Sequence, residues 1–140
     1  MTCPLCTGDG GDVLWKDDRC RIVLVDDRQY PCFCRVIWRE HVKEMTDLGS
    51  AEQNHLIHIV FSVERTLRAM LAPDKVNLAS LGNQVPHLHW HVVPRFSDDA
   101  HFPDPVWGPA HRQGKAHAVD SARLRDQLAE LLDQGKVRHV

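Results

Sequence analysis

The stretch His87-Leu88-His89-Trp90-His91-Val92-Val93-Pro94 places three of the ten histidines of the chain at every second position. Side chains on a β-strand alternate between its two faces, so a strand here would project all three imidazoles from one face at intervals of about 6 to 7 Å. A helix would instead spread them over about 200° of its circumference. The pattern therefore favours a strand that carries a functional site.

Length and composition are typical of one globular domain. The 140 residues are 43% hydrophobic and 26% charged, which is enough apolar material for a single core. The net charge of −2 argues against extended nucleic-acid binding, which usually needs a basic excess. No apolar stretch approaches the roughly 18 residues that span a bilayer, and the N-terminus lacks the features of a signal peptide. We expect a cytoplasmic protein in which residues 1–140 form one domain, with no nucleic-acid or membrane partner.

The five cysteines favour metal binding or burial over a disulfide framework, because their number is odd and the expected compartment is reducing. Cys3 and Cys6 have the two-residue spacing at which two thiolates converge on one tetrahedral metal ion. The alternative is that they are terminal thiols without a ligand. Cys20, Cys32 and Cys34 have no partner at such a spacing, and we expect them to be buried.

Four further segments are predicted to be strands from their β-branched and alternating composition. They are residues 13–15 and 21–25, joined as a hairpin by a charged turn, and residues 32–39 and 75–80. A tight loop over residues 81–86 leads from the last of these into the histidine strand. Adjacent strands should thus bring Asn77 and Gln84 near the imidazoles.

Two segments have helical periodicity. Ser50 and Gln53 can form a capping box, and apolar residues then recur at intervals of three and four as far as Pro73, which ends the pattern. A second helix is predicted to begin near Asp120 as its N-cap and to end near Gly135. Its apolar face would consist of Leu124, Leu128 and Leu131.

The segment between the histidine strand and the second helix is too rich in proline for regular structure. We expect residues 98–109 to form a packed loop that lines or covers the site. His55 and His58, three residues apart on the long helix, are interpreted as solvated, and the three histidines between residues 100 and 118 as loop residues. None of these enters the predicted site.

Two helices and about five strands in hairpin order predict an α+β domain with a mainly antiparallel sheet, one long helix and a C-terminal helix. The segment from His87 to Val93 resembles the signature of the histidine triad (HIT) family, in which three histidines alternate with apolar residues. Asn77, Gly82 and Val85 stand where that family has similar residues. The resemblance implies a HIT-like fold. It covers about residues 3–95, and the loop and helix of residues 96–140 form the C-terminal part of the same domain.

The resemblance implies a homodimeric nucleotide hydrolase or nucleotidyl transferase that acts on a purine nucleotide or nucleotide conjugate. His89 would be the nucleophile that attacks the α-phosphate of a nucleoside phosphoramidate or a (di)nucleoside polyphosphate, and His91 would contact phosphate oxygens or assist the leaving group. A neutral imidazole is a competent nucleophile near pH 7, and no metal is required for that step. The residues expected to bind the substrate are Asp26, through the ribose hydroxyls, and Asn77, Asn83 and Gln84.

The resemblance also implies a structural zinc ion. In the Cys-x-x-Cys members of the family, the two thiolates are joined by the histidine that follows the third strand and by the first histidine of the triad. Those positions match His41 and His87. A site of Cys3, Cys6, His41 and His87 would attach the N-terminus to the catalytic strand. Without zinc, His87 would orient its neighbours through hydrogen bonds.

Two departures from the family leave alternatives open. Phe33 stands where many members have a histidine, and the pair Asn83-Gln84 replaces a Gln-Ser or Gln-Thr pair. Gln84 is longer than serine and would shift the phosphate. One alternative is a nucleotide-binding or regulatory protein with little or no catalytic activity. Another is unrelated metal chemistry at the His-x-His pattern, which would need a carboxylate near the histidines.

Overall fold

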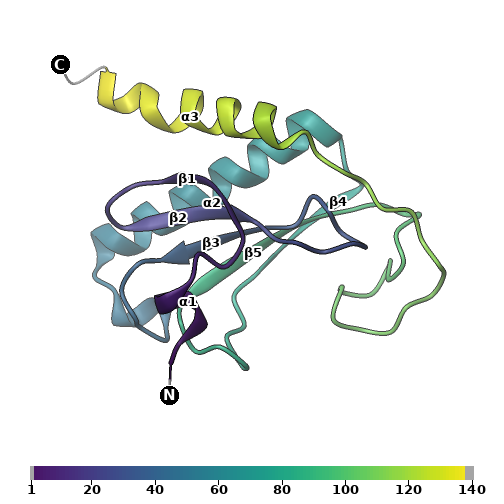
Figure 1. Ribbon diagram of the computed structural model, residues 1–140, viewed down its shortest axis with the longest axis horizontal. Helices are drawn as coiled ribbons and strands as arrows, with labels where there is room; N and C mark the ends of the chain where they lie inside the picture. The colour runs from purple at the N-terminus through teal and green to yellow at the C-terminus, as the bar shows by residue number, and fades with distance from the viewer. Residues whose placement is uncertain (1, 138–140) are drawn as a thin grey trace.

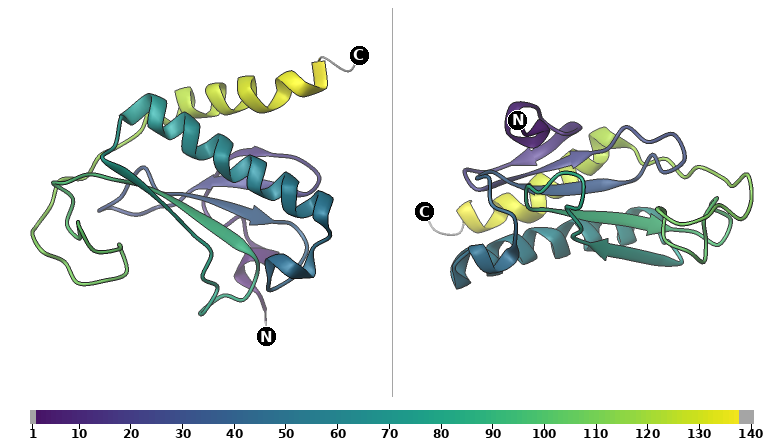
Figure 2. Two further views of the ribbon diagram at one scale, coloured as in Figure 1. Left: turned by 180° about the vertical axis from the view of Figure 1, so that it is seen from behind. Right: turned by 90° about the horizontal axis from the view of Figure 1, so that it is seen from below.

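The fold is built on a five-stranded sheet with the strand order β1-β2-β3-β5-β4, in which all neighbours are antiparallel. The computed structural model describes residues 2–137, with side chains as far as residue 133. Helices α2 and α3 cover one face of the sheet, and the short α1 lies on the opposite face (Figures 1 and 2). The elements are α1 (Pro4–Thr7), β1 (Asp12–Lys16), β2 (Cys20–Leu24), β3 (Cys34–Trp38), the 3-10 turn η1 (Met45–Asp47), α2 (Ser50–Leu71), β4 (Lys75–Ala79), β5 (His89–Arg95) and α3 (Ser121–Val137). The predicted α+β architecture is confirmed.

The main core lies between the sheet and the two long helices. Alternate residues of β3 point into it, namely Cys34, Val36 and Trp38, and the side chains of α2 that recur every three or four residues meet them. Each such aliphatic side chain contributes about 1.5–3 kcal/mol when fully buried. The other residues of β3, among them Arg35, point to the opposite face of the sheet. His89 and His91 of β5 project from that same face.

The start of α2 is capped differently from the prediction. The N–H of Gly49 donates to Oε1 of Glu52 at 3.1 Å, and Nε2 of Gln53 donates to the carbonyl oxygen of Leu48 at 2.9 Å. The predicted capping box of Ser50 and Gln53 is therefore wrong. A carboxylate in the first turn also compensates the positive end of the helix dipole, which an amide does not.

Helix α3 begins as predicted, because Oδ1 of Asp120 accepts a hydrogen bond from the N–H of Arg123 at 3.2 Å. Leu124 and Leu128 are fully buried, but Leu131 is 37% exposed. The neighbouring Leu132 packs on the core instead. Leu132, four residues after Leu128, therefore continues the buried face of the helix, whereas Leu131, three residues after it, points outward. The helix continues through residue 135 to Val137.

The histidine strand is shorter than predicted. Strand β5 begins at His89, so His87 precedes it, and its carbonyl oxygen is bonded to the His89 ring rather than to a neighbouring strand. Pro86, just before it, has no N–H to contribute to a sheet. The expectation that all three imidazoles share one strand face is therefore wrong for His87. The third strand is also shorter, since Phe33 lies in a turn closed by the carbonyl of Tyr30.

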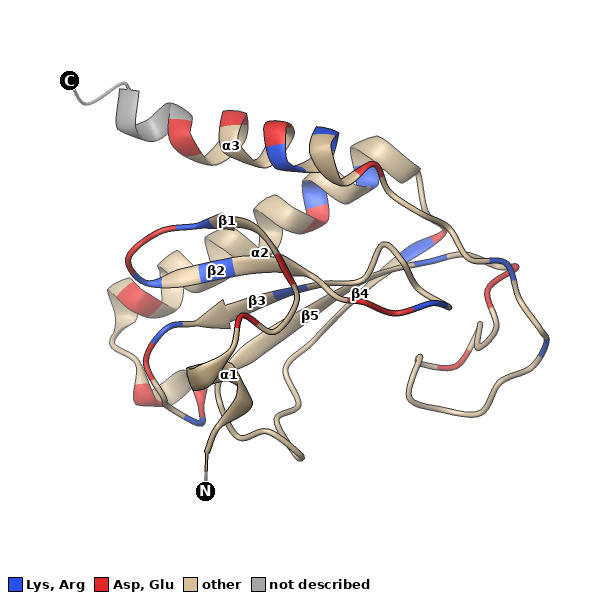
Figure 3. Ribbon diagram, in the orientation of Figure 1, with Lys and Arg blue, Asp and Glu red and all other residues tan. Residues whose placement is uncertain are grey.

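The described part of the chain contains no helix that is both long and apolar enough to cross a membrane. Acidic and basic residues are interspersed along α3 and around the turn between β1 and β2 (Figure 3).

Candidate active site and metal centre

A cavity of about 460 Å³ lies on the sheet face opposite α2, within the size range of small-molecule sites. Strands β3 and β5 contribute three polar side chains to it, and the N-terminal turn, the loop before β5 and Trp107 surround them. None of the described residues that line it carries a carboxylate. The residues that line it are Pro4, Leu5, Gly10, Arg35, Leu81, Gly82, Asn83, Gln84, Val85, His89, His91 and Trp107.

His89 is held in one tautomer by the chain that precedes it. Its Nδ1 lies 2.5 Å from the carbonyl oxygen of His87, and because a carbonyl only accepts, Nδ1 must carry the proton. The lone pair of the neutral ring is then on Nε2. Burial lowers the pKa of His89, outweighing the hydrogen bond to His87, and the charge of Arg35 lowers it further. His89 is thus an uncharged imidazole with a free nitrogen lone pair.

His91 has the complementary tautomer. Nε of Arg35 donates a long hydrogen bond of 3.4 Å to Nδ1 of His91, which leaves the proton of the neutral ring on Nε2. Burial, followed by the charges of His89 and Arg35, lowers the pKa of His91 to about 3. The two rings meet edge to face with their centroids 4.9 Å apart. One cavity therefore holds a nitrogen lone pair on His89 and a neutral N–H donor on His91.

Trp107 covers His91 from the long loop after β5. The ring centroids of Trp107 and His91 are 5.0 Å apart, and Trp107 also meets Phe33 at 6.4 Å. The indole is still 49% exposed, so it forms an accessible apolar rim. The predicted packed loop beside the site is confirmed, because no regular structure is found between residues 96 and 120 and Trp107 lines the cavity.

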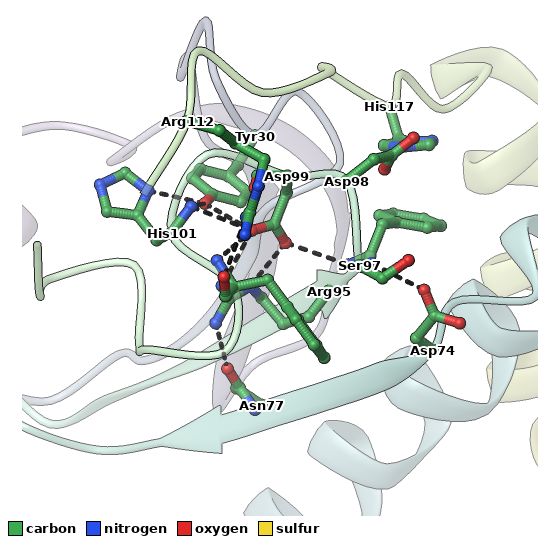
Figure 4. A network of polar contacts seen from close by, with 12 residues as sticks. Tyr30, Asp74, Asn77, Arg95, Ser97, Asp98, Asp99, His101, Arg112 and His117 are labelled. Carbon is green, nitrogen blue, oxygen red and sulfur yellow. Dashed lines mark hydrogen bonds and ion pairs between the residues drawn. The ribbon is translucent and has the colours of Figure 1, made fainter. Parts of the chain in front are cut away.

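A buried polar network fixes the start of this loop (Figure 4). Arg95 makes two hydrogen bonds to the carboxylate of Asp99, with Nε–Oδ2 and Nη2–Oδ1 distances of 2.9 and 3.0 Å. Both side chains are almost completely buried. The hydroxyl of Tyr30 donates to Asp99 at 3.1 Å, and Nδ1 of His101 lies 2.7 Å from that hydroxyl oxygen. The loop that carries Trp107 is thereby tied to β5.

The second cluster of the chain joins the N-terminal turn to the segment before β5. Sγ of Cys3 and Sγ of Cys6 each lie 3.4 Å from Nδ1 of His87, Sγ of Cys6 lies 3.4 Å from Nδ1 of His41, and the two Nδ1 atoms are 3.1 Å apart. All four possible ligand atoms lie within 4.8 Å of one another. The four side chains thus converge on one point.

This donor set fits a tetrahedral zinc ion. Zinc bonds of about 2.3 Å to sulfur and about 2.0–2.1 Å to nitrogen give tetrahedral edges of about 3.5 Å between sulfur and nitrogen and about 3.3 Å between nitrogens. The observed separations are close to these edges. Nε2 of His87 lies 2.6 Å from the carbonyl oxygen of Trp38, so it carries the ring proton and leaves Nδ1 free to bind a metal.

The HIT domain family matches residues 10–98, which is more than half of the chain. The chain belongs to the HIT family. No curated protein matches it. Among solved structures, a HIT protein (SMc02904) from Sinorhizobium meliloti is 27% identical with a TM-score of 0.69, and covers 89% of this chain and 91% of its own.

Two further HIT structures are similar. A histidine triad protein (blr8122) from Bradyrhizobium japonicum is 29% identical, with a TM-score of 0.65 over 86% of this chain and 88% of its own. A HIT family protein from Mycobacterium smegmatis, described as zinc-bound, is 23% identical with a TM-score of 0.65 over 96% and 98%. The last of these supports the fold alone.

The substrate-binding residues predicted from the HIT resemblance are found in three places. Asn83 and Gln84 line the cavity with exposed side chains. Asn77 lines a neighbouring hollow instead, and its Oδ1 accepts a hydrogen bond from Nη1 of Arg95 at 2.8 Å. Asp26 is exposed after β2 and is not among the cavity-lining residues.

Three other histidines are paired with carboxylates outside the cavity. His111 and His117 pair with Asp104 and Asp98, at 2.5 and 2.7 Å. His55 lies 2.7 Å from Asp17, which also accepts two backbone N–H groups in the turn between β1 and β2. His55, Asp17 and Cys20 lie close enough to share a metal ion, although the hydrogen bonds of Asp17 already account for its position.

Sequence reasoning missed Arg35 as a residue of this HIT site. For Arg35 the sequence pattern predicts a strand, and the alternation of Cys34, Arg35 and Val36 places Arg35 on the face that carries the histidines. In the sheet it lies directly opposite His91. The buried pair of Arg95 and Asp99 was also missed, and the only local sign of it is an i, i+4 spacing of opposite charges.

Proposed function

We propose that the chain is a nucleotide hydrolase or nucleotidyl transferase that acts at the α-phosphate of a nucleoside phosphoramidate or (di)nucleoside polyphosphate. The observation that carries this proposal is the pair of opposite tautomers in one carboxylate-free cavity, a lone pair on Nε2 of His89 and a proton on Nε2 of His91. A nucleophile beside a neutral hydrogen-bond donor, which can contact the phosphate oxygens or the leaving group, suits transfer from one acceptor to another.

The proposed reaction has two steps. In the first, Nε2 of His89 attacks the α-phosphorus, a P–N bond forms, and the bond from phosphorus to the leaving group breaks. The leaving group keeps the bonding electrons and takes a proton from water where it needs one, while the Nε2–H of His91 donates a hydrogen bond to it. In the second, water or another acceptor attacks the phosphorus and gives up its proton to the solvent. The P–N bond then breaks and a nucleoside monophosphate, or its ester or amide, is released.

The test is release of nucleoside monophosphate from adenosine phosphoramidate, diadenosine polyphosphates and nucleotidylated amines, followed by chromatography. A His89→Ala variant is the control, and trapped protein should carry a phosphoramidate on His89 only in the wild type. Binding of these compounds without turnover above the control would instead identify a nucleotide-binding or regulatory protein. The proposal that the substrate contains a purine base rests on the family resemblance. Comparing the turnover of adenosine, guanosine and cytidine compounds tests it.

A zinc ion held by Cys3, Cys6, His41 and His87 belongs to the same proposal. It would act as a structural cross-link between the N-terminal turn and the segment before β5, and the reaction uses no step at the metal. The tetrahedral spacing of the four ligand atoms supports this site. The zinc-bound protein from M. smegmatis shows that a chain of this fold can be isolated with that metal.

We also propose that the chain forms a homodimer and is located in the cytoplasm. Phe61, at the middle of α2, is 49% exposed, and Glu64 and Arg68 pair on the same helix. Two copies of α2 packed antiparallel around Phe61 would bury the two Phe61 side chains against each other at a twofold axis. Light scattering of the wild type and of Phe61→Asp tests this, with a dimer expected only for the former. Five free cysteines favour a reducing compartment.

A further inference from the structure

Among the described residues that line the cavity, Arg35 is the only lysine or arginine. It lies at the second position of β3, directly opposite His91 in the register of β3 and β5, and both side chains project from the sheet face that carries His89. The position of the guanidinium beside the two catalytic histidines therefore follows from strand pairing, not from a mobile loop.

The guanidinium of Arg35 has no counter-ion within the described part of the chain. No carboxylate oxygen there lies within 4.0 Å of it, and its one side-chain hydrogen bond is the long contact from Nε to His91. Arg95, by contrast, donates from Nε and Nη2 to Asp99 and from Nη1 to Asn77. The two Nη groups of Arg35 are thus free to donate.

The surroundings of Arg35 keep it charged but poorly solvated. Burial lowers its pKa, and the more distant charge of Asp27 acts in the opposite direction. Phe33 lies beneath it, with the guanidinium carbon 5.6 Å from the ring centroid, within the range of a cation–π contact. A half-buried cation without a partner is costly, and an anion in the cavity would offset that cost.

We propose that Arg35 binds the non-bridging oxygens of the phosphate that His89 attacks, and that it restricts the substrates to those with an ionised oxygen on that phosphorus. This rests on the proposed attack by His89. The planar fork of arginine suits two phosphate oxygens at once. Phosphodiesters, phosphoanhydrides and phosphoramidates meet the requirement, whereas neutral phosphotriesters and carboxylic esters do not.

The same side chain links the phosphate to His91. Nε of Arg35 donates to Nδ1 of His91 and so fixes the proton of that ring on Nε2. Lysine at this position would keep the positive charge but lose the fork and the fixed hydrogen bond. We therefore expect Arg35→Lys to retain part of the anion affinity while turnover falls further than affinity does.

The test compares binding of AMP, adenosine and inorganic phosphate by calorimetry to the wild type, Arg35→Met, Arg35→Lys and Arg39→Met. Arg39 is exposed just after β3, so its replacement removes the same charge away from the cavity. Arg35→Met should weaken AMP binding about tenfold or more, the usual value of hydrogen bonds to a charged group, and leave adenosine binding within about twofold. Arg35→Lys should restore part of the loss, and Arg39→Met should match the wild type.

Equal AMP affinity of Arg35→Met and the wild type would overturn the proposal, as would a wild type that binds neither AMP nor inorganic phosphate. A parallel loss of adenosine binding in the folded Arg35→Lys variant would show a structural role and also overturn it. Loss of AMP affinity in Arg35→Met, together with a wild type that binds AMP but never releases nucleoside monophosphate, would support Arg35 as the anion site while the proposed catalytic function fails. Circular dichroism of each variant establishes that it is folded.

Discussion

Nδ1 of His89 donates a hydrogen bond to the carbonyl oxygen of His87, 2.5 Å away. The ring of His87 is turned the other way, with Nε2 on the carbonyl of Trp38 and Nδ1 among the cysteines. His87 therefore contacts the cysteine cluster through its side chain and orients the proposed nucleophile through its main chain. Substitution at these two histidines should separate the two sites.

His89→Ala should remove turnover, by roughly a thousandfold or more, and leave zinc content and thermal midpoint near those of the wild type. The lost group is the nucleophile, while the carbonyl of His87 remains on the main chain and can bind water. His87→Ala should instead lower zinc content and the thermal midpoint. Nucleoside monophosphate release, metal analysis and thermal unfolding check both variants, and wild-type turnover in His89→Ala would refute its role.

Replacing both thiols of the N-terminal turn should remove one equivalent of zinc. Cys3→Ser/Cys6→Ser is compared with Cys32→Ala, which deletes a buried thiol outside the cluster. Burial and the neighbouring Cys3 raise the pKa of Cys6, so zinc must compete with protons and its affinity should fall as the pH is lowered. Metal analysis after dialysis at several pH values measures this, and equal zinc in both variants would contradict the assignment.

Asp99→Asn should destabilise the protein by about 3 kcal/mol at pH 7, because Arg95 would lose its buried counter-charge. Burial favours the neutral acid, but hydrogen bonds from Arg95 and backbone N–H groups outweigh it and hold the pKa of Asp99 well below its ordinary value. A depressed carboxylate pKa stabilises the fold above the unfolded value, near 4, and this contribution is lost as the pH falls below it.

Urea unfolding at pH 7 and at successively lower pH checks this expectation. The difference between the wild type and Asp99→Asn should narrow as the pH falls below about 4. Asp104→Asn is the control, since Asp104 pairs with His111 at the surface and should matter little. A difference that stays constant down to the lowest pH would contradict the prediction.

Trp107→Ala should raise the pKa of His91 from about 3 toward the ordinary histidine value, because burial is the largest cause of its depression. The pH at which His91 becomes charged, and Nδ1 can no longer accept the hydrogen bond from Arg35, should rise with it. NMR titration of the His91 ring measures the shift. Phe61→Ala, which removes an equally exposed aromatic side chain from α2, should leave it unchanged.

Much of the fold follows from local patterns in the sequence. Strand alternation around His89 and His91, helical periodicity before Pro73 and the N-cap at Asp120 are each encoded within a few neighbouring residues, and the corresponding elements are present. The wrong predictions concern the ends of helices and strands, where several groups compete for the same hydrogen bonds. Glu52 rather than Gln53 bonds the start of α2, and His87 leaves the strand because its carbonyl and ring have other partners.

The site was less predictable where it depends on strand register. Arg35 and His91 are 56 residues apart and become neighbours only through the pairing of β3 with β5. Asn77 was expected near the imidazoles, but the register of β4 places it opposite Val93, within reach of Arg95. A shift by one residue would reverse the face of every side chain, and nothing local in either strand specifies that choice.

The cysteine cluster has a consequence for the order of assembly. Cys3 and His87 touch across 84 positions of the chain, and His41 lies between them. Closing so long a loop is entropically costly, so we expect this contact to form after the pairing of β3 with β5, which brings the two histidines together. Pro4 and Leu5, which line the cavity, sit between the two cysteines. We therefore expect these residues, which leave the ribosome before the strands do, to be among the last to take their places in the fold.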